Sequence, residues 1–325
     1  PKSTAKGRGA GTLPGCDLRM AATNVFRGQI IVTRVWMGLA LGFGLAACGG
    51  TPPFGGAATE PDADTSDGSV YLTEADEDLT LNNITYDATS DTLALNNIPF
   101  DDPDNTYIRI PGTAFTNGFN AYQSEPAAGS QEIQYFAVFR RSDSGASQVA
   151  ASATDVYVDF GFAGAGAQRL SGGTGLPRNG IYTYTGEYAG VRTIAATDGI
   201  QYVTGDVQMR ADFGDFDDVG AVSGEVTNRA LYDEAGQPLG VGAPNQLAVG
   251  SFITLANAEI DFTYGTINSE NAQERSGTSG IRSGSWQGVF AAAGGNEIAG
   301  VVFVEGDDIR EVGGLIATCV GASCP

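Results

Sequence analysis

The residue with the clearest chemical role in this chain is Cys48, which ends an uncharged apolar run. The run begins at Met37, and its last residues are Leu45-Ala46-Ala47-Cys48. This is the pattern of a bacterial lipoprotein signal. In that class the peptide before the cysteine is removed, the thiol receives diacylglycerol, and the new amino terminus is usually acylated as well, for example with palmitate. Arg27 and Arg34 supply the positive flank of such a signal. We therefore expect lipidation at Cys48.

The alternative for this run is a buried apolar helix in a larger domain. The stretch 35–47 is of signal length and too short to span a bilayer, which needs about 20 apolar residues. Gly49-Gly50-Thr51-Pro52-Pro53 suits a flexible tether after a cleavage site. Translation is expected to start at Met20 or Met37. Gly49 is not the Asp that retains some lipoproteins at the inner membrane, so we expect an outer-membrane protein, periplasmic or surface-facing.

Removal of residues 1–47 changes the charge balance. The whole chain has 17 Lys plus Arg, 38 Asp plus Glu and no His. Removal takes six of the basic residues, including both lysines (Lys2 and Lys6), and one acidic residue, so the mature net charge becomes −26. Without His or Lys there is no Ser-His-Asp system, no His-ligated zinc and no Schiff base. The acidity argues against nucleic acid and favours basic or cationic partners.

The cysteines beyond Cys48 are few. Cys16 lies in the removed region, and Cys319 and Cys324 form a closely spaced pair. In an oxidising compartment this pair is expected to close as a local disulfide. The other possibility is metal binding, but two thiolates without a second pair or a histidine make a poor zinc site.

Carboxylates are the remaining candidates for chemistry. Acidic clusters occur at 62–67, at 101–104 and at Asp212, Asp215, Asp217 and Asp218. Each could hold calcium, but a solvated tether, a turn and an exposed hairpin tip explain them more simply. Catalysis by two carboxylates needs a pair held across a cleft, and sequence spacing does not show one. We expect no catalytic residue, no metal and no cofactor.

The elements that position these residues are predicted to be strands. Residues 49–69 lack periodicity and indicate a disordered tether. From Val70 onward, β-prone runs alternate with Gly, Asn, Asp and Pro. A short helix is also predicted at 246–256. The predicted strands are 79–86, 92–95, 107–110, 132–140, 156–160, 181–188, 201–211, 221–228, 259–264, 285–291, 297–304 and 311–317.

The fold class predicted from this pattern is all-β. A break at 172–180 divides the folded part into a smaller, irregular β-rich subdomain (70–175) and an antiparallel barrel of about eight strands (176–325). Residues 1–47 are the leader and 48–69 the tether. A transmembrane barrel is the competing interpretation. It fits less well, because aromatic girdles and a continuous apolar outer face are missing.

The densest motif is Gly284-Ser-Trp286-Gln-Gly288-Val-Phe290, followed by Glu297-Ile-Ala-Gly300-Val-Val-Phe303. In a strand, Trp286, Gly288 and Phe290 share one face. A large-small-large row suits the interior of a small barrel, where Gly288 would let a ring from the opposite wall lie flat. The aromatic residues could instead line a ligand site, but core packing is the simpler role.

These blocks resemble the barrel domain of the transferrin-binding protein B family of surface lipoproteins. The family's Gly-x-Trp-x-Gly-x-Phe strand, turn and Glu-x-x-Gly-x-Phe strand are matched. Phe213 followed by Gly224 resembles a second family hairpin, and Tyr184, Gly186 and Tyr188 are similar to its opening barrel strand. The resemblance covers about residues 180–317.

The resemblance implies an eight-stranded barrel preceded by a handle subdomain, in a lipoprotein that binds a host protein, often an iron carrier, or haem. The chain departs from it in having one handle-plus-barrel unit and in carrying Ala291-Ala-Ala-Gly-Gly295 where relatives have an aromatic-Gly-Pro turn. We expect a non-catalytic binding protein whose ligand or partner is not identified. The alternative is a structural or adhesive surface lipoprotein without a dedicated ligand.

Overall fold

The computed structural model describes residues 69–73, 81, 83–96, 98, 106–126, 133–156, 160–214, 220–240, 242–322 and 324–325. The predicted signal and lipidation site lie outside these residues, and so does the predicted tether (48–69) apart from Ser69, which begins β1 (Ser69–Thr73). Within them the regular structure is β-strand apart from one short 3-10 turn, η2 (Ala293–Gly295).

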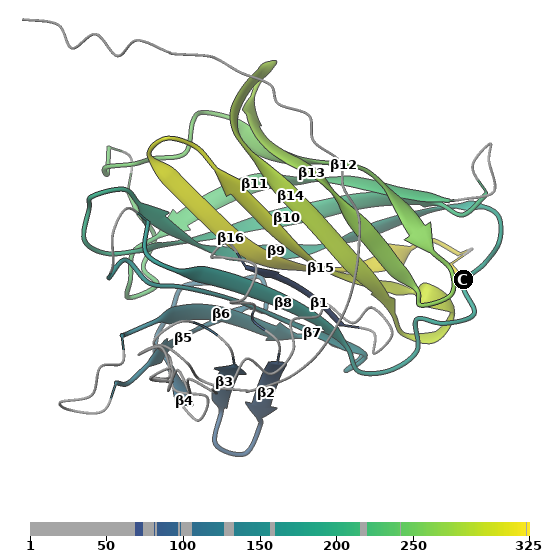
Figure 1. Ribbon diagram of the computed structural model, residues 1–325, viewed down its shortest axis with the longest axis horizontal. Coiled ribbons are helices and arrows are strands. Elements are labelled where there is room, and N and C mark those ends of the chain that lie inside the picture. Colours follow the sequence, from purple (N-terminus) through teal and green to yellow (C-terminus); the bar gives the residue numbers. More distant parts are fainter. Residues whose placement is uncertain are drawn as a thin grey trace, which may run out of the picture. The chain divides into compact units, whose positions relative to one another are not determined.

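The carboxyl-terminal strands form a closed antiparallel barrel, which confirms the predicted fold class (Figure 1). Consecutive strands are neighbours throughout, and β16 closes the barrel by pairing with β9, where Leu315 lies opposite Tyr188. Closure leaves no free strand edge in this sheet. The strands are β9 (Ile181–Ile194), β10 (Gln201–Asp212), β11 (Ala221–Tyr232), β12 (Ser251–Asp261), β13 (Thr266–Ser276), β14 (Ser279–Ala291), β15 (Glu297–Glu305) and β16 (Ile309–Val320).

The preceding strands form an open antiparallel sheet of eight strands in the order β1-β8-β7-β6-β5-β4-β3-β2. One face packs on the outer wall of the barrel, and a second apolar layer, which includes Leu93 and Tyr122, covers the other face. The strands are β1 (Ser69–Thr73), β2 (Asn83–Asp87), β3 (Thr92–Asn96), β4 (Thr106–Arg109), β5 (Asn120–Ser124), β6 (Phe136–Arg141), β7 (Ser147–Ala153) and β8 (Ala163–Arg169).

The sequence analysis predicted no strand at β1, β5, β7, β8 or β13. Of these, β7 and β8 read Ser-Gln-Val-Ala-Ala-Ser-Ala and Ala-Gly-Ala-Gly-Ala-Gln-Arg. Small residues have low strand propensity, so neither segment shows a β signal. All seven residues of β7 are buried, because the open sheet is covered on both faces. Small side chains there let the barrel wall approach closely. The physical reason for the composition is thus the packing of two sheets, which local sequence does not reveal.

Two other local predictions were wrong. Val156 and Phe160 are not in a strand, although residues 157–159 between them lie outside the described part. The helix predicted at 246–256 is a loop followed by the start of β12. The burial of Ser251, Ile253 and Leu255 alternates with more exposed neighbours, which is the period of a strand rather than of a helix.

Adjacent glycines in β16 serve opposite faces of the barrel wall. A Cβ on Gly313 would lie 2.3 Å from Oη of Tyr188 inside the barrel, so the tyrosine lies directly over this glycine. A Cβ on Gly314 would lie 2.9 Å from Cβ of Val149 in the open sheet. Because successive residues of a strand face opposite sides, this pair admits both the interior ring and the neighbouring sheet.

The substitution Gly313→Ala is expected to destabilise the protein by about 1–3 kcal/mol, because the buried Tyr188 ring has to move. The measurement is the free energy of unfolding in urea. Gly240→Ala is the matched control, since no atom lies within 4 Å of its added Cβ and its φ is not positive. Equal stability of the two variants would contradict the close packing described above.

Candidate functional site

The aromatic residues of the motifs lie in the core of the barrel interior. Trp286, Phe290, Tyr184, Tyr188 and Phe213 are each at most 1 % exposed and belong to one hydrophobic cluster. Polar atoms of the larger side chains are satisfied: Trp286 Nε1 donates to the Ala256 carbonyl over 3.0 Å, and Tyr184 Oη donates to the Gly295 carbonyl over 2.8 Å. These residues therefore form a packed core and not a ligand-lined cavity.

The motif glycines are places of close backbone approach. A Cβ on Gly186 would lie 2.0 Å from the Ile316 carbonyl oxygen, and one on Gly224 or Gly300 would lie 2.7 or 2.9 Å from a carbonyl of the neighbouring strand. The expectation for Gly288 was wrong in detail. Its nearest side chain is Ile267 of the adjacent strand, at 3.3 Å, and the ring-over-glycine contact occurs at Gly313 instead.

The acidic residue of the motif, Glu297, faces the open sheet. Ser144 Oγ donates to its carboxylate over 2.7 Å, and Ser147 Oγ donates to the other oxygen. Glu297 is only 2 % exposed, so these hydroxyls replace the water that a buried carboxylate loses. Phe303, on the same strand, is half-buried. Glu297 is thus a connection between barrel and open sheet.

A chain of buried ion pairs crosses the barrel interior, and the sequence analysis missed it. Arg229 donates from Nη1 to Glu274 over 2.7 Å and from Nη2 to Glu311. Arg282 binds the second oxygen of Glu274 at 2.7 Å, and Nε of Arg192 lies 3.4 Å from Glu311. These residues come from β9, β11, β13, β14 and β16. In the sequence, each of these charged residues occupies a position where the alternation of its strand points inward, on the same face as core residues. This alternation is the signal that could have revealed them.

The charges in this chain shift one another's pKa values. Burial alone would lower the pKa of Arg229, but the carboxylates of Glu311 and Glu274 outweigh burial and raise it. Burial alone would raise the pKa of Glu274, but Arg229 and Arg282 hold it below its usual value. Burial lowers the pKa of Arg192, and Glu311 compensates only in part. Arg192 is therefore the least compensated cation of the set.

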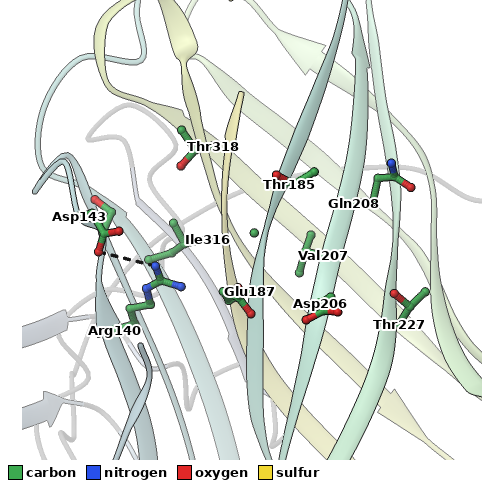
Figure 2. Close-up of a pocket in the computed structure, with 12 residues that line it drawn as sticks. Arg140, Asp143, Thr185, Glu187, Asp206, Val207, Gln208, Thr227, Ile316 and Thr318 are labelled. Carbon is green, nitrogen blue, oxygen red and sulfur yellow. Dashed lines mark ion pairs between the residues drawn. The ribbon is translucent and has the colours of Figure 1, made fainter. Parts of the chain in front are cut away.

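A groove of about 490 Å³ lies on the outer wall of the barrel, beside the open sheet. Figure 2 shows Arg140 and Asp143 on one side, facing barrel strands that carry Glu187, Asp206 and Gln208. Arg140 and Asp143 form an ion pair of 3.7 Å, and Asn228 donates to Asp206 over 2.7 Å. Ile316 adds apolar surface to the lining, whereas the side chain of Val207 belongs to the interior cluster of the barrel. This is an open, mainly polar recess with an excess of carboxylates.

Two of these carboxylates oppose each other directly. Glu187 and Asp206 are register partners of β9 and β10. Like charges at such positions destabilise a sheet. Burial and the charge of Asp206 raise the pKa of Glu187, and Arg140 counteracts them only in part. Repulsion between the two carboxylates therefore destabilises the folded state. Such a pair is unusual on an outer wall, because an uncharged polar residue would be tolerated at either position.

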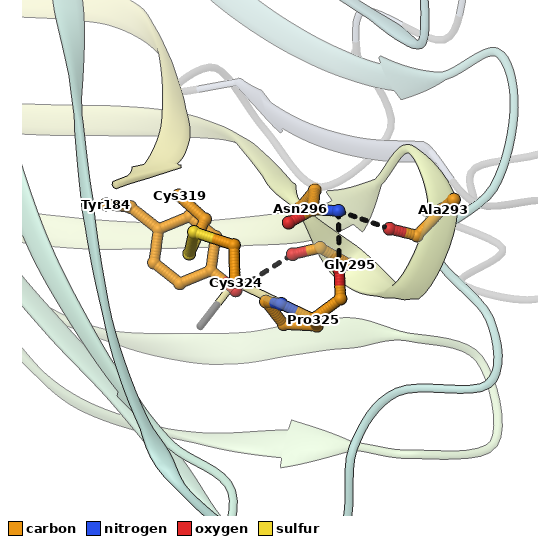
Figure 3. The surroundings of a disulfide bond; sticks show 7 residues. All are labelled: Tyr184, Ala293, Gly295, Asn296, Cys319, Cys324 and Pro325. Carbon is orange, nitrogen blue, oxygen red and sulfur yellow. Dashed lines mark hydrogen bonds between the residues drawn. A yellow bond between two sulfur atoms is a disulfide. The ribbon is translucent and has the colours of Figure 1, made fainter. Parts of the chain in front are cut away.

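The disulfide lies at the end of the barrel where β16 finishes. Cys319 and Cys324 are bonded, with Cα atoms 5.8 Å apart. Figure 3 shows Tyr184 beside them, and Tyr184 is the register partner of Cys319. Asn296 Nδ2 donates to the Pro325 carbonyl over 2.6 Å. The bond therefore holds the segment after β16 against the turn between β14 and β15.

The acidic clusters predicted as possible calcium sites lie largely outside the described residues. Asp212 is among the described residues, and its Oδ2 forms an ion pair with Nη2 of Arg210 at 2.9 Å. Among the described residues, no group of three or more Cys, Asp or Glu side chains is arranged to hold a metal ion. Across the same residues, no helix has the length and apolar character needed to cross a membrane.

No protein-family model and no curated protein matches the chain. Among solved structures, it is similar to a double mutant of transferrin-binding protein B from Haemophilus parasuis Hp5, with 13 % identity, a TM-score of 0.38, and coverage of 74 % of this chain and 45 % of that one. The chain is also similar to a protein described as a surface lipoprotein, with 12 % identity and a TM-score of 0.36. That match covers 80 % of this chain and 100 % of the other. Intact Ap-TbpB, with its N and C lobes, is similar to the chain with 13 % identity and a TM-score of 0.36. The match covers 74 % of this chain and 47 % of that one.

The chain thus spans about half the length of the transferrin-binding protein B structures to which it is similar. At this level of similarity, the partners of those proteins say nothing about the partner of this chain.

Removal of the charge on Glu311 is expected to destabilise the protein by about 3–5 kcal/mol, because buried Arg192 would lose its carboxylate partner and Arg229 would keep Glu274 alone, which it shares with Arg282. Glu311→Gln is the suitable variant, and chemical denaturation measures its free energy of unfolding. Arg210→Gln, which breaks an ion pair whose arginine is 54 % exposed, should change stability by about 1 kcal/mol or less. A loss no larger for Glu311→Gln than for this control would disprove the importance of the buried chain.

Proposed function

We propose that this chain is a non-catalytic binding protein, anchored through lipid at Cys48 in the outer membrane, that captures a partner in the groove on the outer wall of its barrel. Residues 1–47 are the removed leader and 48–69 the tether. Residues 70–175 form a handle-like subdomain and 176–325 the barrel. The alternative remains a structural or adhesive surface lipoprotein without a dedicated ligand.

The observation that carries this proposal is the contrast between the interior of the barrel and its outer wall. Inside, Trp286, Tyr188 and their neighbours are buried in one packed cluster, and ion pairs occupy the space beyond it. Outside, the recess of about 490 Å³ lies between elements of two sheets. Binding sites are typically concave and contain a few placed polar groups. A partner is therefore expected on the wall and not in the interior.

The charge of the groove favours a partner with a cationic group. Its lining includes three carboxylates, Asp143, Glu187 and Asp206, and one cation, Arg140, which is already paired with Asp143. A bound cation would relieve the repulsion between Glu187 and Asp206. Residues that reduce stability without an evident structural benefit are commonly found at functional sites.

The sequence motifs support the same class of protein, because they resemble a family of surface lipoproteins that bind other molecules. In that family the bound molecule is often an iron carrier or haem. The capture experiment described next identifies the bound molecule and so tests whether this chain binds an iron carrier or haem.

The double substitution Glu187→Gln, Asp206→Asn is expected to abolish capture of the partner while it stabilises the fold. The wild-type chain and each variant would serve as bait in native culture medium, and the captured species would be identified by mass spectrometry. Each identified species would then be purified, and its binding to the wild-type chain and to the variants would be measured. Glu259→Gln is the control, since it removes a charge from an exposed position of β12 outside the groove. Repeated empty captures, or equal capture by both variants, would favour the structural alternative.

The stability effect has a defined pH dependence. The pKa of Glu187 is raised in the folded state, so its charge destabilises the fold at pH 7, where Glu187→Gln alone should add at most about 1 kcal/mol. As pH falls through the folded pKa, Glu187 takes up a proton and the gain shrinks. Below the pKa of the unfolded chain the gain disappears. A gain that is constant with pH would exclude carboxylate repulsion as its cause.

The substitution Cys48→Ala is expected to release the protein from the membrane fraction and to prevent incorporation of radiolabelled palmitate. Both readouts follow from loss of the thiol that receives the lipid. Cys16→Ala is the matched control, because this cysteine precedes the predicted cleavage site. Membrane retention and labelling of the Cys48→Ala protein would show that the anchor is elsewhere.

A further inference from the structure

A second recess, of about 340 Å³, lies between β11 and the loop 242–250 that leads into β12. We call it the side pocket. Leu247, Ala248 and Phe252 give it an apolar lining, and Glu225 adds a carboxylate. Arg229 also borders it, but the Arg229 side chain is 0 % exposed and is held among the interior ion pairs. The side pocket therefore offers apolar contact and negative charge to a ligand.

The side pocket lies on the outer face of the barrel wall. Val226 and Ile253 are register partners, and both pack in the interior cluster. Because successive residues of a strand face opposite sides, their neighbours Glu225 and Phe252 face outward. The side pocket is therefore on the same face of the wall as the groove.

The side pocket and the groove are joined. Thr227 belongs to the lining of both, and Asn228 of the side pocket donates to Asp206 of the groove over 2.7 Å. Asp206 is the register partner of Glu187 on one side and of Thr227 on the other, and Figure 2 shows these three residues on neighbouring strands. One continuous surface thus runs across β9, β10, β11 and β12. We call it the wall strip, and its members are Glu187, Asp206, Thr227, Glu225 and Phe252.

The wall strip has a negative end and an apolar end. Glu187 and Asp206 lie at the first, and Phe252 lies at the second with Leu247 beside it. Beyond Phe252, its register partner Arg275 in β13 adds a positive charge. A cation is therefore favoured at the first end and disfavoured at the second, whereas an apolar group gains from burial at the second.

The length of the wall strip matches a short extended peptide. Neighbouring strands are about 4.8 Å apart, so the gap between β9 and β10 is about 10 Å from the gap between β11 and β12. An extended chain advances about 3.3 Å per residue and its alternate side chains share a face, so residues two or four positions apart span about 7 or 13 Å. A basic and an apolar side chain at such a spacing reach both ends of the strip together.

We propose that the wall strip binds an extended basic segment of a partner polypeptide. A lysine or arginine of the segment lies between Glu187 and Asp206, and an apolar side chain two or four positions further along lies against Leu247 and Phe252. Glu225, between the two ends, attracts a second cation. The inference rests on the function proposed for the groove and adds the chemical class of the partner. The charges alone would accept any small cation, and the apolar contact selects a polypeptide.

Isothermal titration of the purified full chain with synthetic ligands tests the proposal. The probe is the peptide acetyl-Ser-Lys-Ser-Lys-Ser-Leu-Ser-amide, which in an extended conformation carries both lysines and the leucine on one face. We expect saturable binding. The same peptide with asparagine in place of leucine should bind about tenfold more weakly, because burial of the apolar side chain is lost. Putrescine, which has the same charge but no apolar side chain, should likewise bind more weakly than the leucine peptide.

Two substitutions at the apolar end of the strip separate the side pocket from the groove. Ala248→Arg should weaken binding of the leucine peptide by about tenfold, because the added cation fills the pocket and repels the segment. Its control is Val249→Arg, since residue 249 is 95 % exposed and outside the lining. Glu225→Gln should weaken binding by about threefold, as expected for loss of one partly exposed ion pair. Its control is Glu259→Gln, at an exposed position of β12 outside both recesses.

The outcomes distinguish failure of this inference from failure of the function on which it rests. Absence of saturable binding, equal affinity of the three ligands, or equal binding by Ala248→Arg and Val249→Arg would each overturn the inference. The groove would still be supported as a cation site if the double substitution Glu187→Gln, Asp206→Asn abolished binding of putrescine. Peptide binding that survives this double substitution and is lost in Ala248→Arg would place the peptide in the side pocket alone and contradict both proposals.

Discussion

The barrel depends on a row of alternating charges that is buried in its interior near one end. Arg192, Glu311, Arg229, Glu274 and Arg282 follow one another in contact, and they come from five of the eight barrel strands. Isolated, each would be expensive to bury, and together they satisfy one another only when all five strands are in register. A slip of one residue in any strand would turn its charge outward and leave the partner uncompensated. These ion pairs thus specify the register of the strands as well as stabilising the barrel.

The same alternation organises the wall outside. In β16, Leu315 and Ala317 pack in the interior cluster, while Val312 and Ile316 pack against the open sheet. One strand therefore serves two cores, and small residues at Gly313 and Gly314 make room on both sides. Because the interior is occupied by aromatic rings and ion pairs, the binding site that we propose lies on the outer wall.

The sequence was most informative where residue type and local structure agree. Strands such as β9 and β10 are rich in β-branched and aromatic residues, so both were predicted with the observed first residue, and the prediction for β10 ended one residue early. The last six residues of β9 were not predicted. The sequence was least informative for β7 and β8, whose Ala, Gly and Ser residues carry no strand propensity. Their conformation follows from burial between two layers, a property of the assembled sheets. The expected role of Gly288 was misplaced for a related reason: the face of a strand can be predicted, but which glycine a ring covers cannot, and here Tyr188 of β9 lies over Gly313 of the neighbouring strand β16.

By itself the sequence determined the all-β class and the chemistry that is excluded by the lack of His, and it predicted a division at 172–180 and lipidation at Cys48. These depend on composition and on short motifs, which are local. Only the tertiary structure decided which charges meet. Glu187 opposes Asp206, and Arg229 reaches both Glu274 and Glu311, through strand pairings and inward positions that bring together residues 19 to 82 positions apart. Such contacts depend on register and closure, and these are set by the packing of the whole barrel.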